Sequence, residues 1–216
     1  MTTLSETRMR TPPALAQSVK RLIDLTGGLA LLILTAPLVA LAALAVKLAD
    51  PGPAFFVQER HGLHGRTFKL VKLRTMRRSA DAWLVAWLAA NPDAPDPRIH
   101  RGAADPRIIP KVGTLLRRYS IDELPQLWNV VRGDLSLVGP RPLPGYHVAL
   151  LDPAFQALRS QVRPGITGSW QVESRDHADP SSLERCDRAY LARWSLMLDL
   201  AILWRTVGCV LRGSGI

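Results

Sequence analysis

The sequence is poor in the residues that build disulfide frameworks and zinc sites. It contains only two cysteines, Cys186 and Cys209, and their spacing fits neither a metal knuckle nor a disulfide framework. The histidines are scattered without the spacing of metal ligands, at His61, His64, His100, His147 and His177. We therefore expect neither a disulfide-stabilised domain nor a histidine metal site, and the low cysteine content favours a reducing compartment.

Two nucleotide-related patterns are missing as well. No glycine fingerprint for nucleotide binding follows a predicted strand, which argues against a conventional glycosyl transferase acting on lipid-linked sugar. The aromatic-plus-basic patterns of known nucleic-acid modules are also absent. Nucleic acid is therefore not an expected partner.

Acidic residues are scarce relative to basic ones. The chain has 18 Asp and Glu against 28 Lys and Arg, which gives a formal net charge of +10 and a pI of about 10.6. Such an excess predicts an anionic partner, and lipid head groups or phosphorylated substrates remain once nucleic acid is set aside. The length of 216 residues suits one domain with a modest core, or a small domain plus a membrane element.

A long apolar run without any charge extends from Leu25 to Val46, directly after Lys20 and Arg21. Its length satisfies the rule for a bilayer-spanning helix. A secretory signal peptide is the first rival interpretation, but the run is long for a signal peptide. We therefore predict a polar, flexible tail at residues 1–18, a membrane helix at residues 19–49 and a cytosolic domain at residues 50–216.

Pro37 lies near the middle of this apolar run, where it removes a backbone hydrogen bond and kinks the helix. Basic residues occur on both flanks of the run, whereas a single span normally has one basic side. This pattern fits a re-entrant helix that bends at Pro37 and returns to the same face. It also fits a simple span in which Pro37 is a mild kink, so the residues alone leave both topologies open.

The rest of the chain predicts a mainly helical α+β domain. Asp50-Pro51-Gly52-Pro53 ends the membrane helix, and two short strands forming a hairpin follow it. The other predicted elements are a short apolar helix at residues 81–90, a helix or turn at 111–118, a strand at 135–138, a turn-rich loop at 163–168 and one long amphipathic helix at 183–211. The amphipathic helix suits either a membrane surface or a cover over the core.

The segment from Ser120 to Pro142 carries the strongest chemical signal. Asp122 and Glu123 are adjacent, a basic run precedes them, and Arg141 is held between two prolines. Carboxylates surrounded by fixed cations suit phosphoryl chemistry, in which cations hold the phosphate oxygens and a carboxylate attacks phosphorus or binds a metal. Ser120 and Glu123 also match a capping box, so helix capping is a second interpretation of the same residues.

Several motifs of the chain resemble those of the bacterial sugar transferases, the monotopic phosphoglycosyl transferases. The resemblance covers nearly the whole chain from Lys20 onward, and seven motifs in order make it specific. The motifs are Phe56-x-Gln58-Glu59-Arg60-x-Gly62, Lys72-Leu73-Arg74-Thr75-Met76, Asp105-Pro106-Arg107-Ile108, Asp122-Glu123-Leu124-Pro125-Gln126, Gly139-Pro140-Arg141-Pro142, Arg163-Pro164-Gly165-Ile166-Thr167-Gly168, and Trp194-Ser195 with Asp199-Leu200.

This resemblance implies a two-step transfer of a sugar-1-phosphate from a UDP-sugar to undecaprenyl phosphate, with release of UMP. It implies that Asp122 is the nucleophile, that Glu123 supports it, and that both carboxylates hold Mg²⁺. Phosphate-binding roles fall by the same resemblance on four basic residues, Arg117, Arg141, Lys72 and Arg74.

The resemblance also implies a re-entrant membrane helix broken at Pro37, interfacial amphipathic helices and an active site on the cytoplasmic face of the inner membrane. Relatives often have Ser-Pro at the break, whereas this chain has Ala36-Pro37 with Thr35 one place earlier. Thr35 can replace the serine by bonding to a backbone carbonyl. The rival hypothesis is a membrane-anchored basic protein that binds acidic lipids without catalysis. The sequence indicates neither the sugar nor the oligomeric state.

Overall fold

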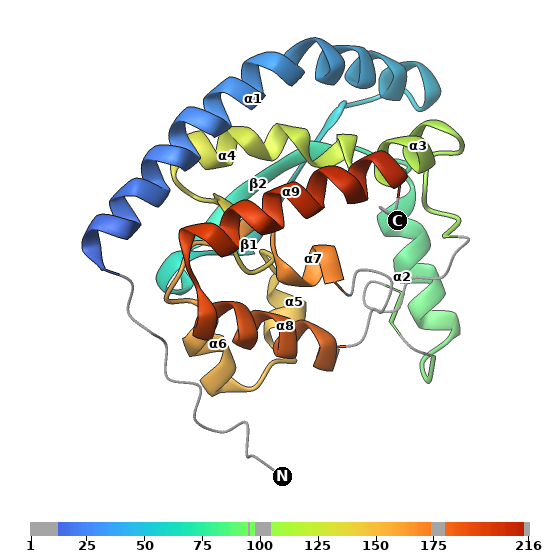
Figure 1. The fold of residues 1–216 in the computed structure, drawn as a ribbon. Coiled ribbons are helices and arrows are strands. Elements are labelled where there is room, and N and C mark those ends of the chain that lie inside the picture. Colours follow the sequence, from blue (N-terminus) through green and yellow to red (C-terminus); the bar gives the residue numbers. More distant parts are fainter. Residues whose placement is uncertain (1–12, 95, 98–104, 174–179, 214–216) are drawn as a thin grey trace.

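The computed structural model describes residues 13–94, 96–97, 105–173 and 180–213 of the chain. It is a mainly helical α+β structure with one long helix and a few short strands (Figure 1), as the sequence predicts. The predicted flexible tail at residues 1–18 falls mostly outside the described residues. Its last part does not: the first helix begins at Ala14, earlier than the predicted residue 19.

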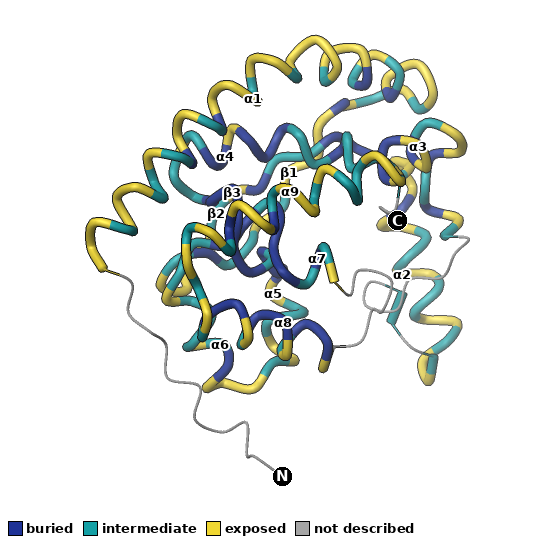
Figure 2. The backbone as a smooth tube through the Cα atoms, in the orientation of Figure 1, coloured by how far each residue is buried: buried dark blue, intermediate teal, exposed yellow. Residues whose placement is uncertain are grey.

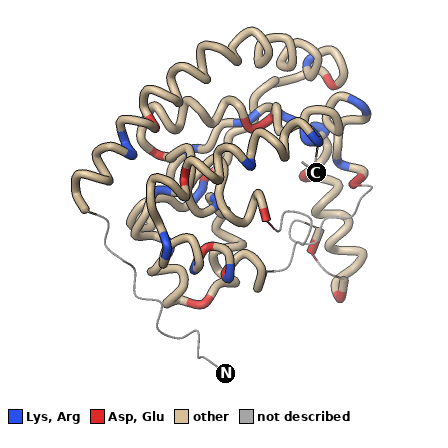
Figure 3. Tube along the Cα trace, in the orientation of Figure 1, with Lys and Arg blue, Asp and Glu red and all other residues tan. Residues whose placement is uncertain are grey.

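Helix α1 (Ala14–Ala49) has 36 residues and continues through Pro37. It is long and apolar enough to cross a membrane by length and composition, and most of its side chains are exposed (Figure 2). Figure 3 shows no charged residue along its middle. The Thr35 hydroxyl donates to the carbonyl oxygen of Leu31 at 2.8 Å, which is the backbone contact expected of it. Such a bond four residues back favours helix bending, and α1 changes direction in Figure 1.

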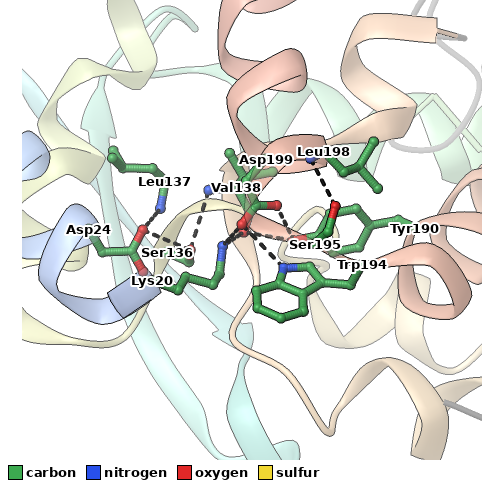
Figure 4. A network of polar contacts seen from close by, with 10 residues as sticks. All are labelled: Lys20, Asp24, Ser136, Leu137, Val138, Tyr190, Trp194, Ser195, Leu198 and Asp199. Atoms are coloured by element: carbon green, nitrogen blue, oxygen red, sulfur yellow. Dashed lines mark hydrogen bonds and ion pairs between the residues drawn. The ribbon is translucent and has the colours of Figure 1, made fainter. Parts of the chain in front are cut away.

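Both ends of α1 pack against the domain formed by the rest of the described chain. Near the N-terminal end, buried Asp24 accepts hydrogen bonds from the Ser136 hydroxyl and the Leu137 N–H, both at 2.9 Å (Figure 4). Near the C-terminal end, Ala42 and Val46 are buried in a cluster with residues from the following segments. The exposed apolar middle of the helix therefore lies between two attached ends.

A second part of the network in Figure 4 joins α1 to helix α9 (Leu196–Arg212). Lys20 donates to the Val138 carbonyl at 2.9 Å and forms an ion pair with Asp199. Asp199 also accepts hydrogen bonds from the Tyr190 hydroxyl and the Trp194 indole N–H. A charge in each helix is thus neutralised by the other, which fixes the position of α1 relative to the domain.

Strands β1 (Phe55–His61) and β2 (Thr67–Leu73) form the predicted antiparallel hairpin. They pair from Phe55 opposite Leu73 to His61 opposite Thr67, and the 3₁₀ turn η2 (Leu63–Gly65) connects them. Helix α2 (Ala80–Ala90) follows at the predicted place, with the rings of Trp83 and Trp87 stacked 6.1 Å apart. Helix α3 (Val112–Arg118) also agrees with the prediction.

The capping-box interpretation of Ser120 is wrong. Ser120 has φ 55°, in the left-handed region, and its side chain makes no capping hydrogen bond. Residues Ile121–Gln126 form a 3₁₀ helix, η3, in which the Glu123 N–H donates to the Ser120 carbonyl at 3.1 Å. Helix α4 (Leu127–Arg132) begins only after Pro125, which has no N–H to donate to an earlier α-helical carbonyl.

The loop predicted at residues 163–168 contains a strand. Strand β4 (Gly165–Thr167) pairs in parallel with β3 (Ser136–Val138), the strand expected at residues 135–138. A Cβ on Gly165 would collide with the backbone of Gly139, so only glycine permits this close pairing. Pro164, Gly165 and Gly168 made this segment resemble a turn.

The long helix predicted at residues 183–211 is two helices, α8 (Pro180–Arg193) and α9. The chain is extended at Ser195, whose hydroxyl accepts from the Leu198 N–H at 3.1 Å and caps α9. Met197, Leu200 and Trp204 are exposed on α9, whereas Ile202 on the same helix is buried in the core, so α9 carries apolar side chains toward both the core and the solvent. Three shorter helices precede α8: α5 (Gly145–Val148), α6 (Pro153–Arg159) and α7 (Ser169–Glu173).

Two clusters of buried apolar residues stabilise the domain. The larger one combines β2, α4, β3, α8 and α9 through residues such as Val130, Leu135 and Leu191. The smaller one combines the C-terminal part of α1 with Leu73, Ile109 and Leu116. Segment η3 lies between them, with Leu124 packed against the larger cluster and Ile121 against the smaller, so its carboxylates have a rigid support.

Candidate active site

Asp122 and Glu123 lie on η3, in the turn between α3 and α4. Asp122 is 7% exposed and Glu123 is half-buried. A 3₁₀ helix has about three residues per turn, so adjacent side chains point about 120° apart. The two carboxylates therefore face different neighbours, although they are consecutive in the sequence.

Glu123 is paired with Arg141. Arg141 Nη2 donates to Glu123 Oε1 at 3.3 Å, and the guanidinium lies over the Trp170 ring at 5.8 Å from its centroid. The backbone of Arg141 is also held, because Arg159 Nη2 donates to its carbonyl oxygen at 2.6 Å. The flanking prolines fix φ on both sides, so the Arg141 side chain starts from a rigid backbone.

Lys72 is close enough to Asp122 for their charges to interact. Burial lowers the pKa of Lys72 to about 8; the charge of Asp122 opposes that shift, while Arg60 and Arg117 add to it. The ammonium group also lies over the Phe56 ring, 5.3 Å from its centroid. An amine with such a pKa is cationic at neutral pH and can both bind phosphate and release a proton.

Arg117 is the second cation whose charge interacts with Asp122. It is buried, and its Nε donates to the Thr75 hydroxyl at 2.8 Å. Burial lowers the pKa of Arg117, whereas the charges of Asp122 and Asp105 raise it. The structure therefore brings Arg117, Lys72 and Asp122 together, with Glu123 and Arg141 beside them.

Arg74 does not join this group. Its guanidinium binds the side chain and the carbonyl of Asp50, and its Nε donates to the Pro53 carbonyl at 2.6 Å. These bonds tie the end of β2 to the end of α1. The phosphate-binding role expected of Arg74 is thus not supported by its position, because its donors are committed to the backbone turn that follows the membrane helix.

Sequence reasoning gave no role to the pair of Asp105 and Arg107. Arg107 Nη2 donates to Asp105 Oδ2 at 2.8 Å, and its guanidinium lies over the Trp83 ring at 5.5 Å from the centroid. Burial alone would raise the pKa of Asp105, but hydrogen bonds from Arg107 lower it below the usual value. Asp105 stays ionised and stabilises the charge of Arg117. The motif Asp105-Pro106-Arg107 could have drawn attention to this pair, but in the sequence it indicated only the family and not what these two residues do.

The carboxylates of the candidate site could hold Mg²⁺ only together with the phosphates of a bound substrate. Among the described residues there is no group of three or more His, Cys, Asp or Glu side chains that could hold a metal. Asp122 and Glu123 nevertheless provide two carboxylates on one turn of η3, although the two side chains face different neighbours. Mg²⁺ is commonly held by one or two carboxylates together with substrate phosphates, so this pair fits that mode of binding.

Comparison with known proteins decides the family. The model of the bacterial sugar transferase family matches residues 15–213, which include all of the helices and strands described above except the first residue of α1. The chain belongs to the bacterial sugar transferase family. The resemblance seen in the sequence motifs is thereby confirmed.

Curated relatives of this sugar transferase cover most of its length. The exopolysaccharide production protein ExoY of Sinorhizobium fredii is 39% identical over 199 residues, with 90% of this chain and 87% of the relative covered. The UDP-glucose:undecaprenyl-phosphate glucose-1-phosphate transferase of Caulobacter vibrioides is 44% identical over 204 residues, covering 89% and 69%. The undecaprenyl-phosphate galactose phosphotransferase of Salmonella typhimurium is 37% identical over 200 residues, covering 91% and 41%. The expectation of an enzyme is confirmed, and a lipid-binding protein without catalysis loses support.

Proposed function

We propose that this sugar transferase moves a sugar-1-phosphate from a UDP-sugar to undecaprenyl phosphate and releases UMP. The names of the relatives from Caulobacter vibrioides and Salmonella typhimurium support the acceptor and the type of group transferred. The observation that carries the proposal is the buried Asp122 carboxylate, which interacts with the charges of Lys72 and Arg117 while Glu123 is paired with Arg141.

The reaction follows from what each group can do. The Asp122 carboxylate attacks the β-phosphorus of the donor, the bond from phosphorus to the bridging oxygen breaks, and UMP leaves with that electron pair. A phosphate oxygen of undecaprenyl phosphate then attacks the same phosphorus, which frees Asp122 and forms the undecaprenyl diphosphate sugar. Both steps exchange one phosphorus–oxygen bond for another.

The surrounding cations serve the same chemistry. Lys72 and Arg117 interact with the charge of Asp122 and would stabilise negative charge on the phosphoryl oxygens. When the donor binds, Arg141 gives up its contact with Glu123 and binds the donor diphosphate instead. Mg²⁺ bound by Asp122 and Glu123 together with the donor phosphates would neutralise charge on the diphosphate.

The attachment of α1 supports a re-entrant topology. Its N-terminal part binds the body through Asp24, and its C-terminal part binds the same body through Val46 and Asp50. If α1 crossed a bilayer, the domain that contacts both of its ends would have to lie beside it in the hydrocarbon layer, which is about 30 Å thick. We therefore place the bend near Pro37 inside the membrane and both ends at the cytoplasmic face of the inner membrane.

Helix α9 fits the same arrangement. Its exposed apolar residues, which include Met197, Trp204 and Leu211, would lie in the interface, where tryptophan is favoured. A nucleotide sugar from water and a lipid phosphate meet only at such an interface. The net charge of +10 suits attraction to anionic lipid.

The test is a UMP-release assay with the purified full chain, undecaprenyl phosphate, Mg²⁺ and a panel of UDP-sugars. We expect release with one or more of the UDP-hexoses and loss of release in Asp122→Asn. Asp134→Asn is a control, because Asp134 contacts Arg132 and Asn129 and is not among the proposed site residues. Full UMP release by Asp122→Asn would contradict the assignment of the nucleophile.

A further inference from the structure

A cavity of about 310 Å³ adjoins the candidate active site through Arg141. It lies between the end of β1, the segment at residues 140–141 and helices α5 and α6. The mechanism above uses only Arg141 among the residues that line it. Its volume is at the lower end of the range of small-molecule sites, about 300–1,000 Å³.

Apolar and polar residues share the cavity wall. Val148, Leu151 and Val162 line it together with Pro140, Pro153 and Pro164, and its polar residues are His61, Arg141, Gln156, Arg159 and Ser160. The apolar part suits the face of an aromatic ring, and the polar residues can meet the edge of that ring. Pro153 and Ala157 line the cavity and are exposed, so it opens to solvent along α6.

Gln156 supplies an acceptor in this wall whose orientation is fixed. Its side-chain amide nitrogen donates to the carbonyl oxygens of Val148 at 2.6 Å and of Leu151 at 3.0 Å. Since both neighbours are acceptors, the nitrogen must occupy that position, and the amide is not free to flip. Gln156 Oε1 is left as an acceptor for a ligand.

Arg159 supplies a donor on the same face of α6, three residues further on. Its Nε donates to buried Asp187 at 3.1 Å and its Nη2 donates to the Arg141 carbonyl at 2.6 Å. These bonds hold the guanidinium in place. Its Nη1 group has no hydrogen-bond partner within the part of the chain that the structure describes, and so keeps donors for a ligand.

We propose that this cavity binds the uracil of the donor nucleotide, an inference that rests on the proposed function. Uracil presents an N3–H donor flanked by two carbonyl acceptors, which matches Gln156 Oε1 beside the Arg159 guanidinium. Cytosine has an acceptor at N3 in place of this donor, so in the same pose its N3 would repel Gln156 Oε1. Arg141 borders both the cavity and Glu123, so a nucleotide seated here has its phosphates beside the dyad.

The test measures nucleotide binding separately from turnover. The full chain in lipid nanodiscs is titrated with UMP, CMP and glucose 1-phosphate by isothermal calorimetry. We expect UMP to bind at least tenfold more tightly than CMP. Ala157→Trp should weaken UMP binding at least tenfold by filling the cavity mouth. The matched control is Ala154→Trp, which is also exposed on α6 but does not line the cavity, and its UMP affinity should equal that of the wild type.

A second variant tests the base edge itself. Gln156→Leu removes the acceptor and should bring the affinities for UMP and CMP within about threefold of each other. Gln156 also donates hydrogen bonds to two backbone carbonyls, so the thermal midpoint of Gln156→Leu is measured to check that it folds. If it does not fold, the Ala157→Trp result still tests the proposal. Equal binding of UMP and CMP by the wild type would overturn the proposal. So would an Ala157→Trp variant that loses glucose 1-phosphate but keeps UMP.

Failure of this inference is distinguishable from failure of the proposed function. If the wild type releases UMP from a UDP-sugar while Ala157→Trp leaves the donor KM unchanged, the cavity assignment is wrong and the function stands. If UMP binding depends on Ala157 while no UDP-sugar is turned over, the uracil site stands and the proposed reaction is wrong.

Discussion

At the residue scale, Lys72 is the group whose charge limits the pH range of the proposed reaction. Burial lowers its pKa to about 8 against the opposing charge of Asp122, so it loses its charge as the pH rises through 8. A neutral amine no longer attracts a diphosphate, and kcat/KM for the donor should fall about tenfold per pH unit above 8. Lys72→Arg keeps its charge there and should lack this alkaline decline. A pH profile of kcat/KM checks this, and identical declines in both proteins would rule it out.

Asp187 should make stability depend on pH in the acidic range. Burial raises its pKa from 3.8 to about 6 in the folded state, although Arg159 opposes the shift. The resulting stabilisation is present below pH 4 and is lost as the pH rises through 6, a change of about 3 kcal/mol. Chemical unfolding measures the free energy of unfolding of the wild type and of Asp187→Asn. The difference, wild type minus variant, should therefore decrease between pH 4 and pH 7. A difference that is flat with pH would contradict the buried placement of Asp187.

Single residues also show what the sequence can reveal about the site. Asp122, Glu123, Lys72, Arg117 and Arg141 come together as the motifs predict, since charged residues in motif positions indicate chemistry directly. Arg74 lies in the same motif as Lys72 but binds Asp50 instead. No pattern of residue types distinguishes these two cations, because the direction of a side chain depends on the packing of distant segments.

At the element scale, local patterns predicted α1, α2, α3 and the hairpin, but they gave no sign of α5, α6 or α7 and failed where contacts between distant segments decide the structure. The hairpin and α2 follow from alternation and apolar spacing within a few residues. Strand β4 forms only because Gly165 approaches Gly139 across the fold. Ser195 separates α8 from α9 by a cap within a run that otherwise has helical periodicity, so the break was not expected.

The attachment of α1 to β3 gives a prediction at this scale. Asp24→Ala leaves the Ser136 hydroxyl and the Leu137 N–H without their buried acceptor, which should destabilise the protein by about 2–4 kcal/mol. The thermal midpoint in detergent measures the loss. Thr26→Val serves as the control on the same helix, because the Thr26 hydroxyl bonds only to its own helix at an exposed position. Equal midpoints for Asp24→Ala and Thr26→Val would refute the role of this contact.

At the scale of the whole molecule, the attachment of both ends of α1 predicts that they share one side of the membrane. Ser18 and Ser79 are exposed on either side of the helix and can each be changed to cysteine with little change in size. In a background with Cys186→Ser and Cys209→Ser, a membrane-impermeant maleimide should label both positions in inverted vesicles and neither in intact cells. Labelling of the two positions from opposite sides would establish a spanning helix.

The central claim is that Asp122 forms a covalent bond to the transferred phosphosugar. Its most direct test is a rapid-quench measurement of UMP release in the absence of undecaprenyl phosphate. We expect a burst approaching one UMP per protein molecule, with one sugar phosphate attached to the peptide containing Asp122, and no burst in Asp122→Asn. UMP release that begins only when the acceptor is added, without an attached sugar phosphate, would show direct transfer and rule out the covalent intermediate.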